Sequence, residues 1–465
     1  MSAPQDFNPA FATAAETAEA IHGKRISAAE LLDATFRRVD LHNAKINAIV
    51  LQCREQAVKR ACQADESLAH GERWGLLHGV PVTIKESFAY RGSPSSWGLP
   101  PLKDVNSPRT AVAVERLESA GAIVIGKTNV PVMLGDWQSY NSIYGTTNNP
   151  WDLTRTPGGS TGGGAAALAA GLGCLTLGSD LAGSVRIPAH FCGVYGHKPT
   201  LDLVNTDGFQ PGPWDGSPGY PMDLAVLGPL ARSAQDLRLV LNAIGGPNGD
   251  DATAWSWHMP APRRMRLKDF RVGYVMDGDF APVSSDAGKV YEHALAELAR
   301  AGAAMEPGWP QGIEPQAQLR TFNYLLLAFV NAAATVEPHA RWLEETQKRL
   351  AYRAMWQKYF ESHDVFLLPA GFSAAFLHDP SQPLDQRIIQ TPEGPRPYVN
   401  TALWSCFATL AGLPATVAPI GRTIEGLPVG VQIIAPMWED GTSIEFAESL
   451  AEIVGGFEAP PGFDE

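Results

Sequence analysis

The sequence lacks the features typical of secreted, membrane-spanning and metal-scaffolded proteins. Its five cysteines are odd in number and show no CxxC or Cys/His ligand spacing, which argues against a disulfide framework and a zinc site. No basic segment followed by an apolar run lies near Met1, and no stretch of about 18 apolar residues occurs in the chain. We therefore expect a soluble, cytoplasmic protein with reduced cysteines, no membrane contact and no metal or other cofactor.

Positive charge is also scarce in this chain. Lys and Arg number 36 against 49 Asp and Glu, a formal net charge of −13, so an electrostatic attraction to nucleic acid or anionic lipid is not expected. Hydrophobic residues make up 45% of the sequence and charged residues 18%. That composition indicates a globular protein with ample material for a core.

Short apolar runs rich in β-branched residues alternate with stretches of helical spacing. The predicted strands cover 79–84, 122–125, 174–178, 272–275, 365–368, 415–418 and 431–434, and the predicted helices between them cover 111–121 and 162–171. This alternation favours an α/β fold with a mixed, mostly parallel sheet covered by helices on both faces.

No charged linker or shift in composition divides the chain, so we expect one large domain over residues 1–465. Ser27-Ala-Ala-Glu30 reads as a capping box at the start of an amphipathic helix, and residues 1–70 are expected to form a helical N-terminal layer. Two stretches, 205–223 and 370–398, are broken by Gly and Pro and resist assignment to helix or strand. Long segments of this kind are often functional, so both are candidate rims of a substrate pocket.

A glycine-rich loop, Gly158-Gly-Ser-Thr-Gly-Gly-Gly164, carries the first candidate for catalysis. A phosphate-binding loop would need Lys and then Ser or Thr after the last glycine, but Ala165 and Ala166 follow. The nucleophile elbow of α/β-hydrolases would need a buried strand directly before Ser160, whereas residues 149–157 are polar and interrupted by proline. Neither motif accounts for the loop.

Together with two other segments, this loop resembles the amidase signature family. The two segments are Thr83-Ile-Lys-Glu86 and Gly178-Ser-Asp-Leu-Ala-Gly-Ser-Val-Arg-Ile-Pro188. Further matches are Ala120-Gly-Ala-Ile123, Gly126-Lys-Thr-Asn129, Asn149-Pro-Trp-Asp152, Phe191-Cys-Gly193, Leu410-Ala-Gly-Leu-Pro414 and Gly426-Leu-Pro-Val-Gly-Val-Gln-Ile-Ile-Ala-Pro436. Because so many matches occur in order, the resemblance is specific, and it implies the family's fold and amide-hydrolysing activity.

The resemblance implies a catalytic triad. Ser184 would be the acylated nucleophile, Ser160, joined to Gly159 by a cis peptide bond, would be the bridging serine, and Lys85 would be the base. The residues themselves agree with this chemistry, because a serine hydroxyl needs a base within reach and no histidine here has a recognisable place in a Ser/His/Asp arrangement. A lysine can serve if burial lowers its pKa enough to leave it neutral. Ser160 precedes a predicted helix, and the other two follow predicted strands, so all three are expected at one edge of the sheet.

The residues just before the predicted nucleophile complete the candidate site. Their backbone amides can form an oxyanion hole, and they are Leu181, Ala182 and Gly183. The family usually has glycine at position 182, so Ala182 adds bulk beside the oxyanion. By the same resemblance, Asp180 and Arg186 brace this turn rather than react.

Residues 131–140 resemble the family segment that walls the acyl pocket. Within it, Met133, Leu134 and Trp137 are the predicted substrate-binding residues, and their character predicts tolerance for hydrophobic or aromatic acyl groups.

Two histidines and a cysteine also lie close to Ser184 in the sequence. Cys192 matches a core position of the family, whereas His190 and His197 are open to either a core or a pocket position.

The sequence thus predicts a serine amidohydrolase that acts, with water, on small, fairly apolar amides or anilides; esters and carbamates (urethanes) react through the same acyl-enzyme chemistry. The alternative is the glutaminase-type A subunit of a tRNA-dependent amidotransferase, which belongs to this family and needs partner subunits. The altered segment 130–134, and Glu86 where that subunit commonly has Asp, count against it. A non-catalytic family member is disfavoured because all three catalytic positions are filled. A homodimer is compatible with the sequence, which does not fix the oligomeric state.

Overall fold

The structure is a computed structural model and describes residues 7–212, 222–331, 338–380 and 383–464. The α-helices are α1 Ala14–His22, α2 Ala28–Ile46, α3 Arg54–Ala69, α4 Val112–Ser119, α5 Gly162–Ala169, α6 Arg186–Cys192, α7 Ala234–Ile244, α8 Asp251–Ala254, α9 Ser285–Arg300, α10 Pro315–Val330, α11 His339–Tyr359, α12 Cys406–Ala411 and α13 Asp440–Val454. None of the helices in these ranges is both long enough and apolar enough to cross a lipid bilayer.

In the part of the chain that the structure describes, the strands form one large sheet and two small antiparallel pairs. The strands are β1 Ile49–Gln52, β2 Pro81–Lys85, β3 Ile123–Thr128, β4 Tyr140–Asn141, β5 Gly145–Thr146, β6 Leu175–Asp180, β7 Tyr195–Lys198, β8 Val226–Ala231, β9 Arg271–Tyr274, β10 Ala304–Pro307, β11 Val365–Pro369, β12 Ile388–Thr391, β13 Gly394–Pro397, β14 Ala415–Arg422 and β15 Pro428–Ile434. Short 3₁₀ helices cover Pro100–Leu102, Val132–Leu134, Leu267–Asp269, Leu384–Gln386 and Tyr398–Ser405.

Within the described ranges the large sheet has eleven strands in the order β1-β3-β2-β6-β8-β7-β14-β15-β11-β9-β10. The expected α/β fold with a mixed sheet is confirmed. Parallel pairing is concentrated in two blocks, β3-β2-β6 and β11-β9-β10, and the pairs between these blocks are antiparallel. The pairing of β14 with β15 is antiparallel for a local reason, because a short turn joins the two strands as a hairpin.

Helices cover both faces of the sheet, as expected. Val82 and Ile84 of β2 pack into a core shared with α4, α7, α9 and α13. Ile123 and Ile125 of β3 pack on the opposite side, against α2, α3 and α5. Alternate residues of a strand point to opposite faces, so strands buried on both sides read as continuous apolar runs. This is why the sequence pattern identified them.

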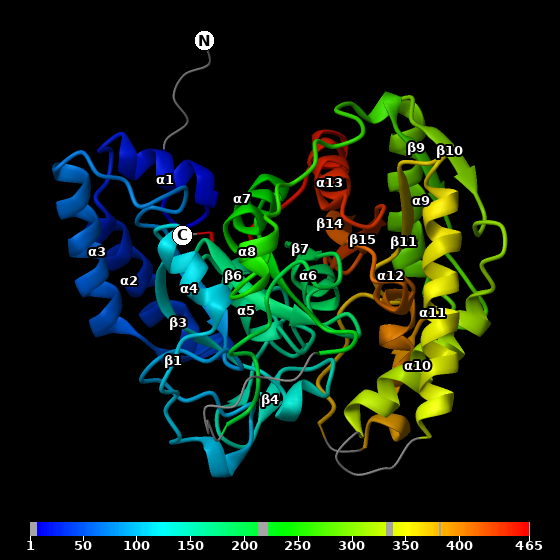
Figure 1. Ribbon diagram of the computed structural model, residues 1–465, viewed down its shortest axis with the longest axis horizontal. Helices are drawn as coiled ribbons and strands as arrows, with labels where there is room; N and C mark the ends of the chain where they lie inside the picture. The colour runs from blue at the N-terminus through cyan, green and yellow to red at the C-terminus, as the bar shows by residue number, and fades with distance from the viewer. Residues whose placement is uncertain (1–6, 213–221, 332–337, 381–382, 465) are drawn as a thin grey trace.

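The N-terminal stretch 1–70 contributes α1, α2 and α3, which gather at one end of the molecule (Figure 1). The predicted capping box at the start of α2 is present, with the Ser27 side chain accepting from the Glu30 amide and the Glu30 carboxylate accepting from the Ser27 amide. The stretch is not wholly helical, because β1 within it pairs with β3 at the edge of the large sheet.

The two stretches expected to have no helix or strand differ. In 205–223, the described residues 205–212 and 222–223 have no helix or strand, and 213–221 lie outside the described residues. In 370–398 the expectation was wrong, because β12 and β13 pair as an antiparallel hairpin. Thr391-Pro-Glu-Gly394 makes the turn, with Gly394 at a φ of +111°. A polar, proline-containing hairpin at the surface lacks the apolar run that marks a buried strand.

Candidate active site

Lys85 is the last residue of β2 and is completely buried. Its Nζ lies 2.6 Å from the hydroxyl oxygen of Ser160 and 2.9 Å from that of Ser179. Burial lowers the pKa of Lys85 well below its ordinary value, and the charge of Asp180 opposes that shift only in part. The structure therefore brings a lysine with a strongly depressed pKa into hydrogen-bond contact with two serines.

Ser160 lies two residues before α5, in the glycine-rich loop, and its peptide bond with Gly159 is cis. Gly159 allows the loop to approach the segment 131–140, because a Cβ at this position would lie 2.5 Å from the carbonyl oxygen of Asp136. The hydroxyl of Ser139 in that segment donates to the Gly158 carbonyl (3.1 Å) and accepts from the Gly162 amide. These contacts fix Ser160 beside the lysine.

Ser184 lies in the turn between β6 and α6, where the Asp180 carboxylate organises the backbone. Asp180 accepts from the amides of Gly183 (2.9 Å), Val185 (3.0 Å) and Arg186 (3.3 Å). Gly183 has a φ of +92°, a conformation that favours glycine. The buried Asp180 carboxylate therefore fixes the conformation of the turn that carries Ser184.

The hydroxyls of Ser160 and Ser184 border the same cavity, but they do not hydrogen-bond to each other in the part of the chain that the structure describes. The backbones around them are linked, since the amide of Thr161 donates to the Ser184 carbonyl (3.1 Å). Catalytic hydrogen bonds are often long or poorly aligned without substrate.

The three predicted oxyanion amides are not equivalent in the structure. The Gly183 amide already donates to Asp180. The amides of Leu181 and Ala182 have no partner among the described residues. Trp137 supports this segment from behind, because its Nε1 donates to the Ala182 carbonyl (2.9 Å). Within the described ranges, the amides of Leu181 and Ala182 are thus free to donate beside Ser184.

Asp180 and Arg186 form a buried ion pair, with Nη2 to Oδ1 at 2.7 Å and Nε to Oδ2 at 3.0 Å. Burial alone would raise the Asp180 pKa, but Arg186 and the backbone amides hold it at about 2. Arg186 also donates to the Ser405 carbonyl and to the side chains of Thr409 and Gln432. These bonds tie the turn before α6 to the 3₁₀ segment, α12 and β15.

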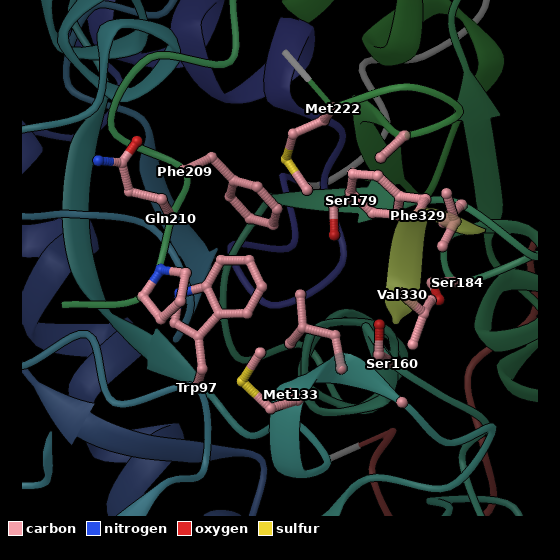
Figure 2. A pocket seen from close by; sticks show the side chains of 15 residues that line it. Trp97, Met133, Ser160, Ser179, Ser184, Phe209, Gln210, Met222, Phe329 and Val330 are labelled. Carbon is pink, nitrogen blue, oxygen red and sulfur yellow. The ribbon is translucent and has the colours of Figure 1, made fainter. Parts of the chain in front are cut away.

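A cavity of about 370 Å³ opens onto these serines (Figure 2). It is lined by Trp97, Met133, Leu134, Gly135, Ser160, Ser179, Leu181, Ser184, Phe209, Gln210, Pro211, Met222, Ala225, Phe329 and Val330. Of the three residues predicted to bind substrate, Met133 and Leu134 line this cavity, but Trp137 does not border it. Its indole instead packs beside Tyr398, with ring centroids 5.5 Å apart. The described part of 205–223 contributes to the lining, whereas that of 370–398 does not.

The stretch 370–398 instead supports the cavity wall from behind. Arg387 donates to Oδ2 of Asp136 (2.7 Å) and to the hydroxyl of Tyr140 (2.7 Å), and Tyr398 hydrogen-bonds Oδ1 of Asp136. These bonds hold the base of the segment that carries Met133, which has a φ of +52°. The residues that flank the β12–β13 hairpin therefore hold the segment 131–140 in place through Asp136.

The two histidines and the cysteine that lie close to Ser184 in the sequence are all buried. His190 is buried between the Ser373 carbonyl (3.0 Å) and the Gly430 amide (2.7 Å), and burial lowers its pKa to about 4. His197 is buried against Asp440 and Thr416. Cys192 is buried in the core, as expected. In the described ranges, no group of three or more His, Cys, Asp or Glu side chains has an arrangement that could hold a metal ion.

Several residues that line the cavity were not predicted from the sequence. Ser179, the second partner of Lys85, directly precedes Asp180 in the matched motif, and that position was its only sequence signal. Trp97 follows β2 in an irregular loop, and Phe329 and Val330 end α10, more than 140 residues from Ser184. These residues meet only through the tertiary fold.

The sequence model of the Amidase family matches residues 30–339 and 320–443. The chain is 32% identical over 468 residues to an acylamidase of Rhodococcus erythropolis, covering 95% of each protein. It is 29% identical over 488 residues to the A subunit of a glutamyl-tRNA(Gln) amidotransferase of Picosynechococcus sp., covering 94% of this chain and 97% of that protein. A bacterial aryl acylamidase of the amidase signature family shares the fold, with a TM-score of 0.80 at 22% identity over 95% of this chain and 96% of that one. The chain therefore belongs to the amidase signature family and is a hydrolase of carbon–nitrogen bonds.

Proposed function

We propose that the protein hydrolyses small, fairly apolar amides through an acyl-enzyme on Ser184, with Ser160 as proton relay and neutral Lys85 as base. The observation that carries this proposal is the buried Lys85 amine, 2.6 Å from the Ser160 hydroxyl and with its pKa strongly lowered by burial. A neutral lysine has a lone pair and can accept a proton.

In the proposed acylation step, Ser184 Oγ attacks the substrate carbonyl carbon while its proton passes to Ser160 and the proton of Ser160 passes to Lys85. Collapse of the tetrahedral intermediate breaks the C–N bond, and the relay returns a proton to the leaving amine. Water then attacks the ester on Ser184 with the same groups as base, which releases the acid and restores the serine. No redox step or external cofactor is needed for this balance.

In this proposal the developing oxyanion accepts from the amides of Leu181 and Ala182, which have no partner among the described residues. Each such donor contributes about 3 kcal/mol to transition-state stabilisation. The Gly183 amide is already bound to Asp180, so its role in this proposal is to hold the turn rather than to bind the oxyanion.

The cavity lining supports apolar amides over glutamine. Among the described residues it contains no charged side chain. Free glutamine carries a carboxylate and an ammonium group, and burying either one without a charged partner costs several kcal/mol. An amidotransferase A subunit and an acylamidase are similar to this chain to nearly the same degree, so overall similarity does not separate the two functions. The uncharged cavity lining favours the amidase over the glutaminase-type subunit. Esters and carbamates that fit the cavity would react by the same route.

A substrate panel tests this function. Purified wild-type protein and S184A would be given an apolar anilide, a primary amide, an ester, a carbamate and glutamine, with a fluorophosphonate probe for the nucleophile. We expect turnover of the apolar substrates and labelling of Ser184 in the wild type only. Substantial hydrolysis by S184A would contradict the nucleophile. A preference for glutamine, together with copurifying subunits, would favour the amidotransferase instead of a free-standing monomer or homodimer.

A further inference from the structure

The cavity beside Ser184 has a closed end and an open end. At the closed end, Trp97 is 5% exposed and Phe209 is 2% exposed. At the open end, Val330 is 61% exposed. Figure 2 shows Trp97 and Phe209 together on one side of the cavity, with Phe329 and Val330 on the side of Ser184.

Trp97 and Phe209 form an aromatic corner at the closed end. Their ring centroids are 5.0 Å apart with an angle of 51° between the planes, and Phe88 stands behind Phe209 at 4.8 Å. Aromatic rings prefer such tilted arrangements, and each ring face is electron-rich while its edge is electron-poor. A third ring entering the corner would find the partners that aromatic side chains prefer.

The corner is rigid because Trp97 is held at three points. Its indole Nε1 donates to the Ser87 carbonyl (3.0 Å), and its carbonyl accepts from the Met133 amide (2.8 Å). Its own amide donates to Oε2 of Glu86 (2.9 Å). Trp97 has a φ of +52°, which a tryptophan adopts only where its surroundings impose it. A pre-positioned ring loses little conformational freedom when a ligand binds.

Glu86 is the residue that fixes this turn. It is completely buried, directly follows Lys85, and accepts the amides of Ser96 (2.7 Å) and Trp97 with its two carboxylate oxygens. A carboxylate can accept both bonds, whereas a glutamine in its place would present one oxygen and one NH₂ group. Phe209 is placed independently, since Gly208 packs so closely on Ala111 that a Cβ would lie 2.5 Å from its Cα.

We propose that the corner formed by Trp97 and Phe209 is a subsite for an aromatic ring of the substrate, and that Glu86 is the positioning residue that holds it. The proposal rests on the proposed hydrolysis at Ser184 and names the class of amide that the site prefers, arylalkyl amides. The other substituent of the amide extends toward the open end at Val330.

Two matched substrate pairs test the subsite. One pair places the ring on the acyl side, N-methylphenylacetamide against N-methylpropanamide, and the other on the amine side, N-benzylacetamide against N-ethylacetamide. In at least one of the two pairs, the phenyl substrate should have a kcat/KM about tenfold or more higher than that of its alkyl partner. W97L and F209L should each reduce this preference about tenfold or more, while F329L at the open end, the matched control, should change it less than about threefold.

Glu86 is tested by E86Q and E86D. E86Q should raise KM for the phenyl substrate more than it lowers kcat, and E86D, which keeps the carboxylate, should retain more of the phenyl preference. A purely structural role would lower kcat for both members of a pair alike. If E86Q fails to fold, W97L and F209L decide the question of the subsite.

Labelling of Ser184 by a fluorophosphonate separates the two levels of failure. If wild-type Ser184 is not labelled, the proposed function fails. If Ser184 is labelled in W97L and F209L but the phenyl preference equals that of the wild type, the function stands and the aryl subsite is overturned.

Discussion

Two lysines on neighbouring strands are equally buried but lie in opposite chemical settings. Lys85 ends β2 and Lys127 lies in β3, and the parallel register pairs Lys127 with Ile84 rather than with Lys85. Paired residues share a face and successive residues alternate, so the two side chains leave opposite faces of the sheet. Lys85 meets two serine hydroxyls, whereas Lys127 donates to the carbonyls of Phe88 (2.8 Å) and Pro94.

The partners decide what each buried lysine can do. A carbonyl only accepts, so the pair of carbonyls around Lys127 requires N–H donors and suits a cation. A hydroxyl can also donate, so Ser160 can give its proton to a neutral Lys85. Burial lowers the pKa of Lys127 to about 8, with Glu86 opposing the shift, and lowers that of Lys85 well below its ordinary value. Burial alone therefore does not make a lysine a base, because the hydrogen-bond donors and acceptors around its amine decide whether it can take up a proton.

The sharpest test of the comparison is K85M. Methionine fills a similar volume but has no lone pair for the proton, so kcat should fall about 10³-fold or more. Stability should not fall, because a buried amine is replaced by an apolar group. Amide turnover and chemical denaturation measure the two effects, and retention of more than a tenth of the wild-type kcat would remove Lys85 as the base.

The matched change, K127M, should show the reverse pattern. It leaves the carbonyls of Phe88 and Pro94 without their buried donor, so the free energy of unfolding should fall by about 2 to 4 kcal/mol. The loss in kcat should be far smaller than in K85M. Urea denaturation followed by fluorescence checks the stability, and an unchanged midpoint would mean that Lys127 does not anchor the loop after β2.

The pH dependence of the reaction sharpens the same contrast. Only neutral Lys85 can accept a proton, so kcat/KM should fall about tenfold per pH unit below the Lys85 pKa and level off above it. Asp180, with a pKa of about 2, and His190, at about 4, are already in one form at neutral pH. K85R, which stays protonated, should be inactive at every pH. A pH profile in which activity falls as the pH rises through neutrality would contradict a lysine base.

Stability provides a second readout of the same group. The pKa of Lys85 is lower in the folded than in the unfolded chain, so the unfolded chain binds more protons between the two values. Wild-type stability relative to K85M should therefore increase as the pH rises toward about 10.5, the ordinary lysine value. A difference between the two proteins that stays constant with pH would mean that Lys85 titrates normally.

The smallest expected effect belongs to Ser179. Its hydroxyl, 2.9 Å from Nζ, orients the Lys85 amine toward Ser160. Losing one such hydrogen bond costs about 1 kcal/mol, so S179A should lower kcat about fivefold, with S179T retaining more activity. Steady-state kinetics with the apolar amides tests this, and equal kcat values for the wild type and S179A would leave Ser179 without a role in orienting the base.

Some buried strands could not be predicted from the sequence because they do not consist of a continuous apolar run. β7 ends in His197 and Lys198, and β8 contains Gly228 and Pro229, yet both are buried in the middle of the large sheet. The polar end of β7 is satisfied by distant groups, including Asp440, which lies 3.1 Å from His197. Such partners become neighbours only after the chain has folded.

The order of residues along the chain was enough to predict the α/β class, the family and the three residues proposed for catalysis. The class followed from the alternation of apolar runs and helical spacing, whereas the family and Lys85, Ser160 and Ser184 followed from short motifs that resemble those of the amidase signature family. Three features depend on the folded chain: Ser179 also contacts the lysine, the Gly183 amide is already occupied, and Trp137 lies behind the cavity rather than in it. Trp97, Phe209 and Phe329 come together across more than 200 residues of sequence, so their shared cavity follows from the packing of the whole sheet and its helices.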